Sequence, residues 1–307
     1  MFSSTKDTIM NKRTIMAMPA VVFWCVIGVC VLGIIIGSFW DYDIGMAVAN
    51  RTDIGTYFAT FSPALAYCLI PGGGSCLYVG LKKKSNSYKP VAWTLLIFSW
   101  FIAVRFSNGY FGKHVRPLFG YIPGESSAFL SFASWALWAI LYALVPLILI
   151  PCLDDTNPDK LIAVGAALIV ASLASDAVMQ WLKQVGSRPR PKYLLTLDDP
   201  ASEYRDWWEM IPNLAGDNDN YQSWPSGHMS IVGVLYALPM LIDCLKKRSF
   251  RKKIITFIFI CVFIVMCAYN RMHMTNHFLS DVCFGTLNAT LITAVVCTTF
   301  ESLSRNN

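Results

Sequence analysis

The sequence predicts an all-α protein that forms a polytopic membrane bundle of about eight transmembrane helices. Two observations carry this prediction. Hydrophobic residues make up 55% of the 307 residues and charged residues 14%, whereas an average soluble domain carries about 25% charge. The mean hydropathy is +0.48. Polar side chains are too few to cover a core of this size, so most of the surface is expected to face lipid. This composition excludes a disordered chain and an ordinary cytosolic enzyme.

Apolar stretches recur along the whole chain. A hydrocarbon layer about 30 Å thick needs roughly 20 helical residues. Eight stretches fit by composition: residues 19–40, 58–81, 90–107, 128–151, 161–183, 228–245, 254–270 and 278–299. We expect the run Pro71-Gly72-Gly73-Gly74 to interrupt the second stretch, with close helix packing as its default explanation.

Lysine and arginine concentrate in the loops on one side of the predicted bundle. They are Lys12, Arg13, Lys82, Lys83, Lys84, Lys89, Lys246, Lys247, Arg248, Arg251, Lys252 and Lys253. The positive-inside rule assigns this side, with both termini, to the cytoplasm. The same bias accounts for most of the net charge of +6, so we expect membrane anchoring rather than a nucleic-acid partner. The ten cysteines form no CxxC pair and have no Cys/His metal spacing, so we expect no metal site.

Three polar clusters border the later apolar stretches. They cover residues 183–191, 224–228 and 270–281, and the predicted topology brings all three to the side opposite the lysine-rich loops. Lys183, Arg190 and Arg271 supply a point charge and two planar forks, which suit a phosphate group.

The remaining polar residues of the clusters suggest how such a phosphate could react. Ser226 and Gly227 open a helix, whose free N–H groups favour an anion. His277 and Asp281 are four residues apart on one helix face, so Asp281 could accept the proton of one imidazole nitrogen while the other attacks. His228, on a separate helix, could protonate a leaving oxygen.

Each feature taken alone has a purely structural explanation. A cation at the end of a span usually extends its charge to the interface, a Pro-Ser-Gly run usually caps a helix, and a His with an Asp one turn later is usually a polar pair. The ordered combination on one membrane face is what favours chemistry.

Taken together, the clusters resemble a known enzyme family. The patterns Lys183-x6-Arg190-Pro191, Pro225-Ser226-Gly227-His228 and Arg271-x5-His277-x3-Asp281 are similar to the three signatures of the type 2 phosphatidic acid phosphatases. That superfamily also includes glucose-6-phosphatase and the vanadium haloperoxidases. The resemblance covers about residues 161–299. It departs from the family pattern at Asn270, where the third signature usually has serine.

The resemblance implies a role for each matching residue. His277 would be the nucleophile that forms a phosphohistidine, and Asp281 would orient it. His228 would protonate the leaving alkoxide and then activate water. Lys183, Arg190 and Arg271 would hold the phosphate together with Ser226 and Gly227. Neither a metal nor another cofactor is implied.

Three further residues are candidates for supporting contacts. Arg188 also precedes a proline, but its spacing from Lys183 is two residues short of the signature, so we assign the signature arginine to Arg190. His273 lies two helical turns before Asp281 and is a poorer partner for it than His277. Asp176 shares one helix face with Lys183 and is expected to face the bundle interior near the catalytic pocket, because an intramembrane carboxylate is costly.

The expected organisation is therefore a set of N-terminal transmembrane helices of unassigned role (1–160), a phosphatidic-acid-phosphatase-like catalytic core (161–300) and a short cytoplasmic tail (301–307). The expected function is a metal-independent phosphatase that acts on a lipid phosphate, as a phosphomonoester or diphosphate, at the extracytoplasmic or lumenal face. The alternatives are a lipid-to-lipid phosphotransferase, a phosphatase for a soluble substrate, and a non-catalytic phospholipid-binding or transport protein. The sequence predicts no oligomeric state.

Overall fold

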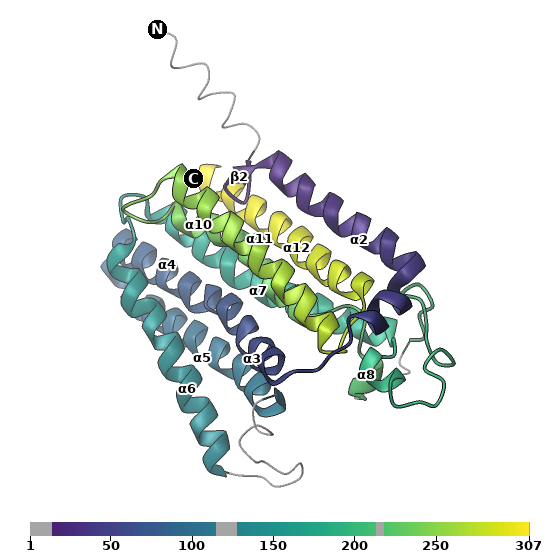
Figure 1. Ribbon diagram of the computed structural model, residues 1–307. Helices are drawn as coiled ribbons and strands as arrows, with labels where there is room; N and C mark the ends of the chain where they lie inside the picture. Colours follow the sequence, from purple (N-terminus) through teal and green to yellow (C-terminus); the bar gives the residue numbers. More distant parts are fainter. Residues whose placement is uncertain (1–13, 115–127, 213–217, 307) are drawn as a thin grey trace.

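The computed structural model describes residues 14–114, 128–212 and 218–306, and this part of the chain is helical almost throughout (Figure 1). Its strands are two short ones, β1 (Thr14–Ile15) and β2 (Met18–Pro19), which pair antiparallel just before the first long helix. The prediction of an all-α bundle is confirmed.

Seven helical segments within the described residues are long and apolar enough to cross a membrane. They are Ala20–Ala47, Ile54–Lys84, Asn86–Gly109, Phe132–Cys152, Pro158–Leu194, Phe250–His273 and Leu279–Ser304. Each contains or overlaps one of the predicted stretches. The remaining stretch, 228–245, corresponds to the shorter apolar helix Gly227–Ile242.

That shorter helix is built from three pieces: α9 (Gly227–Val232), the 3-10 turn η5 (Gly233–Ala237) and α10 (Leu238–Ile242). All residues of α9 and η5 are buried, which places them among the other helices rather than against lipid.

The N-terminal helices begin with α2 (Ala20–Ala47), followed by α3 (Asp53–Tyr67) and α4 (Leu69–Lys84). The predicted interruption falls at Cys68, before the Pro71 run, so the expected position was wrong by three residues. Proline lacks the N–H that would donate to the carbonyl four residues earlier, and its ring clashes there, so the break precedes Pro71 and the glycines lie inside α4. A Cβ on Gly73 would come within 2.6 Å of the Gly165 carbonyl oxygen, so these glycines allow close packing.

The other helices follow in order. They are the turn η1 (Asn86–Tyr88), α5 (Lys89–His114), α6 (Ala128–Leu149), the turn η3 (Ile150–Cys152), α7 (Pro158–Gly186), α8 (Pro191–Leu194), the turn η4 (Asp219–Tyr221), α11 (Phe250–His273) and α12 (Leu279–Asn306). The residues expected to form a tail thus continue α12 as far as Asn306.

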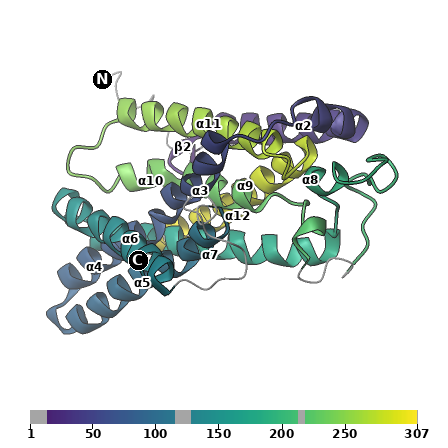
Figure 2. The same cartoon turned by 60° about the horizontal axis from the view of Figure 1, so that its bottom comes forward.

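Neighbouring helices pack in the order α6, α5, α4, α7, α12 and α2, with α3, α9 and α11 against one another (Figure 2). One hydrophobic core joins both halves of the chain, since it contains Tyr67 and Trp138 as well as Met229 and Val282. The N-terminal helices are therefore part of the wall around the C-terminal half.

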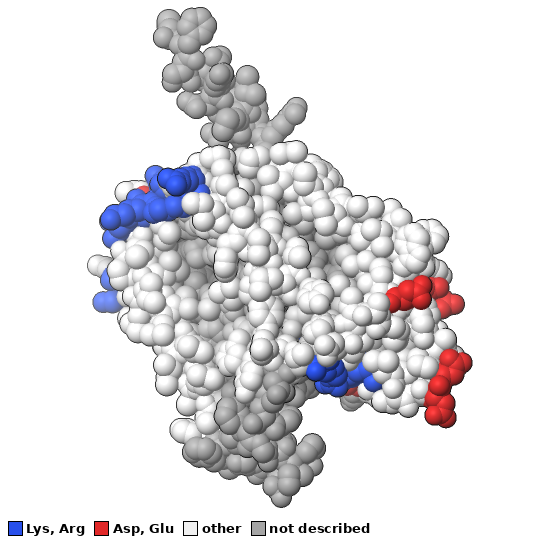
Figure 3. Space-filling model, in the orientation of Figure 1, with Lys and Arg blue, Asp and Glu red and all other residues white. Residues whose placement is uncertain are grey.

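The lysine-rich loops meet at one end of the bundle (Figure 3). Lys84 pairs with Asp159 and Arg248 with Asp154, and the Lys253 ammonium donates to the Ala17 carbonyl. At the opposite end, the three predicted polar clusters lie together. There the Ser223 N–H donates to the Arg188 carbonyl and the Lys192 N–H to the Thr275 carbonyl.

The contact between α4 and α7 gives a stability prediction. Gly165→Ala places a methyl group about 2.5 Å from the Gly73 carbonyl oxygen, so we expect the unfolding free energy to fall by about 1–3 kcal/mol. Gly28→Ala is the matched control, because a Cβ there meets nothing within 4 Å. Thermal unfolding of the detergent-purified variants measures the effect. Equal melting temperatures for the two variants would contradict close packing at Gly165.

Candidate active site

A cavity of about 760 Å³ lies at the end opposite the lysine-rich loops. The three predicted polar clusters all contribute to its wall. Its lining includes Lys183, Arg190, Gly227, His228, Arg271 and His277. Residues that are almost one hundred positions apart in the sequence therefore face one partly open cavity.

The three predicted phosphate-binding cations reach this space from separate segments. Lys183 lies in the last turn of α7, Arg190 directly precedes α8, and Arg271 lies in the last turn of α11. All three are at least nine-tenths buried. The Lys183 ammonium donates to the Gln222 carbonyl at 2.6 Å, and the Arg190 guanidinium donates to the Asn276 side-chain oxygen at 3.1 Å.

The carboxylate of Asp219 pairs with two basic residues at the cavity. One oxygen lies 3.0 Å from Arg190 Nη2, and the other lies 2.5 Å from Lys192 Nζ. Asp219 and Lys192 both line the cavity. The carboxylate thus occupies a position beside Arg190 where another anion would compete with it.

The start of α9 forms another part of the wall. Gly227 lines the cavity, whereas Ser226 lies just behind it. The Ser226 N–H donates to the backbone carbonyl of Asp281 at 3.0 Å. Its hydroxyl is buried and has no hydrogen-bond partner in the described part of the chain.

His277 is held in one tautomer by a backbone carbonyl. Its Nδ1 lies 2.7 Å from the Ser223 oxygen. A carbonyl can only accept, so Nδ1 carries the proton and Nε2 keeps a lone pair. The Asp281 carboxylate is 4.0 Å from Nδ1, beyond hydrogen-bond distance. It instead accepts from the Ser223 hydroxyl at 2.6 Å, so the direct contact expected between Asp281 and His277 is replaced by one through Ser223.

The environment of His277 keeps its imidazole neutral. Burial lowers the pKa of His277 well below its ordinary value, and the positive charges of Arg190, Arg271 and Lys183 lower it further. A neutral ring with a lone pair on Nε2 is the form that can act as a nucleophile.

The second histidine is fixed from the N-terminal half of the chain. His228 Nε2 lies 2.9 Å from the carbonyl oxygen of Ala59 in α3. Nε2 therefore carries a proton and donates it to this carbonyl. No sequence signal pointed to Ala59, because a backbone carbonyl is present in every residue.

Residues 162–305 match the family model of the PAP2 superfamily. The C-terminal half of this chain is a PAP2 domain. This confirms the family predicted from the three signatures, and the domain contains every predicted site residue. No curated protein and no solved structure matches the chain.

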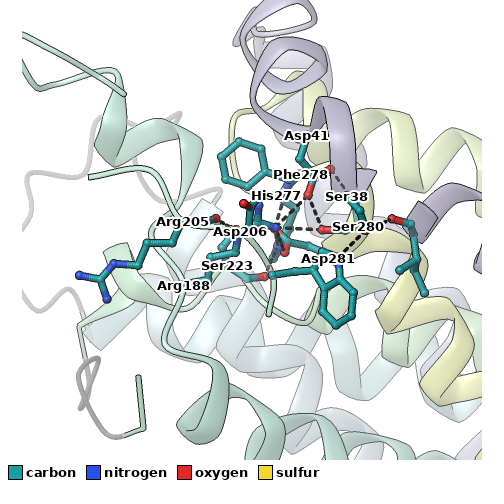
Figure 4. A network of polar contacts seen from close by, with 12 residues as sticks. Ser38, Asp41, Arg188, Arg205, Asp206, Ser223, His277, Phe278, Ser280 and Asp281 are labelled. Carbon is teal, nitrogen blue, oxygen red and sulfur yellow. Dashed lines mark hydrogen bonds and ion pairs between the residues drawn. The ribbon is translucent and has the colours of Figure 1, made fainter. Parts of the chain in front are cut away.

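Arg188 lies at the centre of a buried polar network in the PAP2 domain (Figure 4). Its Nη1 lies 2.8 Å from Asp281 Oδ1 and 3.0 Å from the carboxylate of Asp41 in α2. Its Nε donates to the Arg205 carbonyl at 2.8 Å. Arg188 does not line the cavity, so the structure places it behind Asp281. The sequence analysis missed Asp41, although a carboxylate at the end of a long apolar stretch was a usable signal.

The other two supporting candidates lie in different places. Asp176 lines the cavity with Gln180, on the helix face that leads to Lys183. His273 lies outside the cavity lining: its Nδ1 is 3.0 Å from the Val48 carbonyl oxygen, and its ring stacks on Tyr269.

The N-terminal helices also supply side chains to the cavity of the PAP2 domain. These are Thr56, Ala59, Tyr67 and Phe106, joined by Arg51 from the segment between α2 and α3, and the sequence analysis singled out none of them. Within the described residues, no group of three or more His, Cys, Asp or Glu side chains is arranged to hold a metal ion.

The neutral state of His277 predicts a pH-dependent stability. The unfolded chain takes up a proton at His277 near pH 6.5, whereas the folded chain resists it. Above about pH 6.5, His277 is neutral in both states and does not lower the free energy of unfolding. Below that pH, protonation of the unfolded chain lowers the free energy of unfolding by up to about 1.4 kcal/mol per pH unit. We expect His277→Asn to show a smaller drop in melting temperature between pH 7.5 and 5.5 than the wild type. His273→Asn is the control, and an equal drop in all three proteins would refute the prediction.

The Asp219 ion pairs predict a competition with bound anions. Asp219→Asn keeps the size of the side chain but removes its charge, so Arg190 and Lys192 become better partners for an anion. We expect inorganic phosphate to bind about two- to fivefold more tightly, the range of a half-exposed ion pair. Isothermal titration measures this. Asp199→Asn, an exposed acidic residue of the same loop, is the control, and unchanged affinity in Asp219→Asn would contradict the competition.

Proposed function

We propose that this PAP2 protein is an integral membrane phosphatase that hydrolyses a lipid phosphate through a phosphohistidine intermediate. One observation carries the proposal. The cavity joins three buried cations, a neutral histidine and a second histidine at the end of a bundle of apolar helices. Cations and N–H groups fixed in a site of low dielectric stabilise a phosphoryl group in transfer.

In the proposed complex, Lys183, Arg190 and Arg271 hold the phosphate oxygens. The backbone at Gly227 contributes from the start of α9, and the Ser226 hydroxyl lies close behind. Three positive charges match the charge that the phosphoryl group carries in the transition state, so we propose that the reaction is metal-independent.

In the first proposed step, His277 Nε2 attacks the phosphorus and forms a P–N bond while the bond to the lipid oxygen breaks. His228 donates a proton to that leaving oxygen. Because Nε2 of His228 is committed to Ala59, the proton for this step would reside on Nδ1. In the second step, His228 takes a proton from water, whose oxygen attacks the phosphorus. The P–N bond then breaks and releases inorganic phosphate.

The membrane setting supports a lipid as the substrate. The wall of the cavity includes Tyr67, Phe106 and Met179 from the spanning helices, and Met274 directly after α11. A lipid chain can remain beside them in the bilayer while its headgroup reaches the histidines. We propose that this end of the bundle is extracytoplasmic, since the lysine-rich end fits the cytoplasmic side.

The proposal predicts phosphate release from a lipid phosphate panel by the detergent-purified protein in the presence of EDTA. We expect His277→Ala to lose at least about 10³-fold in rate, as for removal of a nucleophile. His273→Ala, a histidine outside the cavity, is the control. Release that stops in EDTA would contradict metal independence. If the folded protein releases no phosphate from any lipid, the proposed phosphatase activity is contradicted. Transfer of the phosphoryl group to an added lipid alcohol would identify a phosphotransferase instead.

A further inference from the structure

The first long helix, α2, places a carboxylate inside the polar network of the PAP2 domain. Asp41 is 1% exposed, although it lies in the part of the chain that the family match does not include. Glycines on the same helix make room for this approach. A Cβ on Gly37 would lie 3.0 Å from Ser280, and one on Gly45 would lie 2.7 Å from the ring of Phe278. The helix thus docks directly on the segment that follows His277.

Both oxygens of Asp41 are used. Oδ1 accepts from the Ser280 N–H at 2.9 Å. Oδ2 accepts from the Ser280 hydroxyl and from Arg188 Nη1, the latter at 3.0 Å. The carboxylate therefore holds the start of α12 and the arginine at the same time (Figure 4).

Arg188 connects Asp41 with the segment that contains His277 and Asp281. The same Nη1 donates to Asp281 Oδ1 at 2.8 Å. Asp281 Oδ2 accepts from the Ser223 hydroxyl and from the Phe278 N–H. The Ser223 carbonyl accepts from His277 Nδ1. A continuous series of buried polar contacts thus connects α2 with the imidazole.

The charges of Asp41, Arg188 and Asp281 explain why the network needs all three residues. Asp41 and Asp281 are both fully buried, and Arg188 lies between them. A buried ionised carboxylate needs a charged partner and hydrogen bonds. With Asp41 present, Arg188 has a fixed position, and Asp281 keeps one oxygen for Ser223. Without the charge of Asp41, the arginine can shift toward Asp281 or toward the Arg205 carbonyl.

We propose that Asp41 is a positioning residue of the PAP2 active site, which acts through Arg188, Asp281 and Ser223 to keep the His277 ring in its reactive tautomer and orientation. This inference rests on the proposed function. It assigns a role in the reaction to α2, whereas family membership covers only residues 162–305. Asp41 itself does not line the cavity, so it acts on the rate of the chemical step rather than on phosphate binding.

The test compares full-length wild-type protein with Asp41→Asn. We expect kcat for lipid phosphate hydrolysis to fall about 10- to 100-fold, as for other residues that orient a reactive group from behind. KM and the affinity for inorganic phosphate should change by less than about twofold, because the three cations are untouched. Asp41→Glu, which keeps the charge, should recover part of kcat. Asp43→Asn, the same change at an exposed position of α2, is the matched control.

A spectroscopic measurement separates this inference from the proposed function. The nitrogen chemical shifts of 15N-labelled His277 report which ring nitrogen is protonated, with or without turnover. We expect Nδ1–H in the wild type and in Asp43→Asn, and a mixture of tautomers in Asp41→Asn. A wild type that shows this tautomer but releases no phosphate would contradict the function and leave the positioning intact.

Two results would overturn the inference. One is that Asp41→Asn keeps both the wild-type kcat and the wild-type tautomer of His277. The other is that kcat and the phosphate affinity of Asp41→Asn both fall in proportion to the amount of folded protein that is lost. If Asp41→Asn does not fold, Asp41→Glu takes its place, with a reduced kcat and an unchanged phosphate affinity as the expected result.

Discussion

The buried ion pairs of Arg188 with Asp41 and Asp281 are the interaction on which the rest of the site depends. They join three segments: the first spanning helix, the turn after α7 and the start of α12. Removal of one partner from such a group leaves an uncompensated buried charge, which costs about 3–5 kcal/mol. The geometry around His277 is therefore coupled to the docking of α2, and the N-terminal helices cannot be regarded as a separate anchor.

In the proposed reaction, two requirements oppose each other at this end of the bundle. A phosphate group needs positive charge nearby, whereas a nucleophilic imidazole must stay neutral. The cavity meets both, because burial and the surrounding cations lower the pKa of His277 while the Ser223 carbonyl fixes the proton on Nδ1. The carboxylates stay away from the imidazole: Asp281 is 4.0 Å distant and Asp219 pairs with Arg190 and Lys192.

Much of this arrangement could be predicted from the sequence, because side chains with rare chemistry stand at fixed spacings. The apolar stretches predicted the bundle, and the three signatures predicted the family and six residues of the cavity lining, whereas Ser226 and Asp281 lie outside that lining. Contacts made by backbone carbonyls could not be predicted: nothing in the sequence distinguishes Ala59 or Ser223 from any other residue as an acceptor. The position of Asp41 at the end of an apolar stretch was a usable signal, but nothing in the sequence links it to Arg188, which lies 147 residues away. The helix break fell at Cys68 because the effect of a proline acts on the turn before it.

The proposed phosphohistidine is tested most directly by trapping it. The protein is mixed with a lipid phosphate, quenched in alkali, where phosphohistidine survives, and digested for mass spectrometry. The account predicts a phosphoryl group on the peptide that contains His277, at higher occupancy in His228→Ala because hydrolysis of the intermediate is slowed, and none in His277→Ala. A phosphoryl group on another residue, or turnover by the wild type with no labelled His277 in either protein, would contradict it.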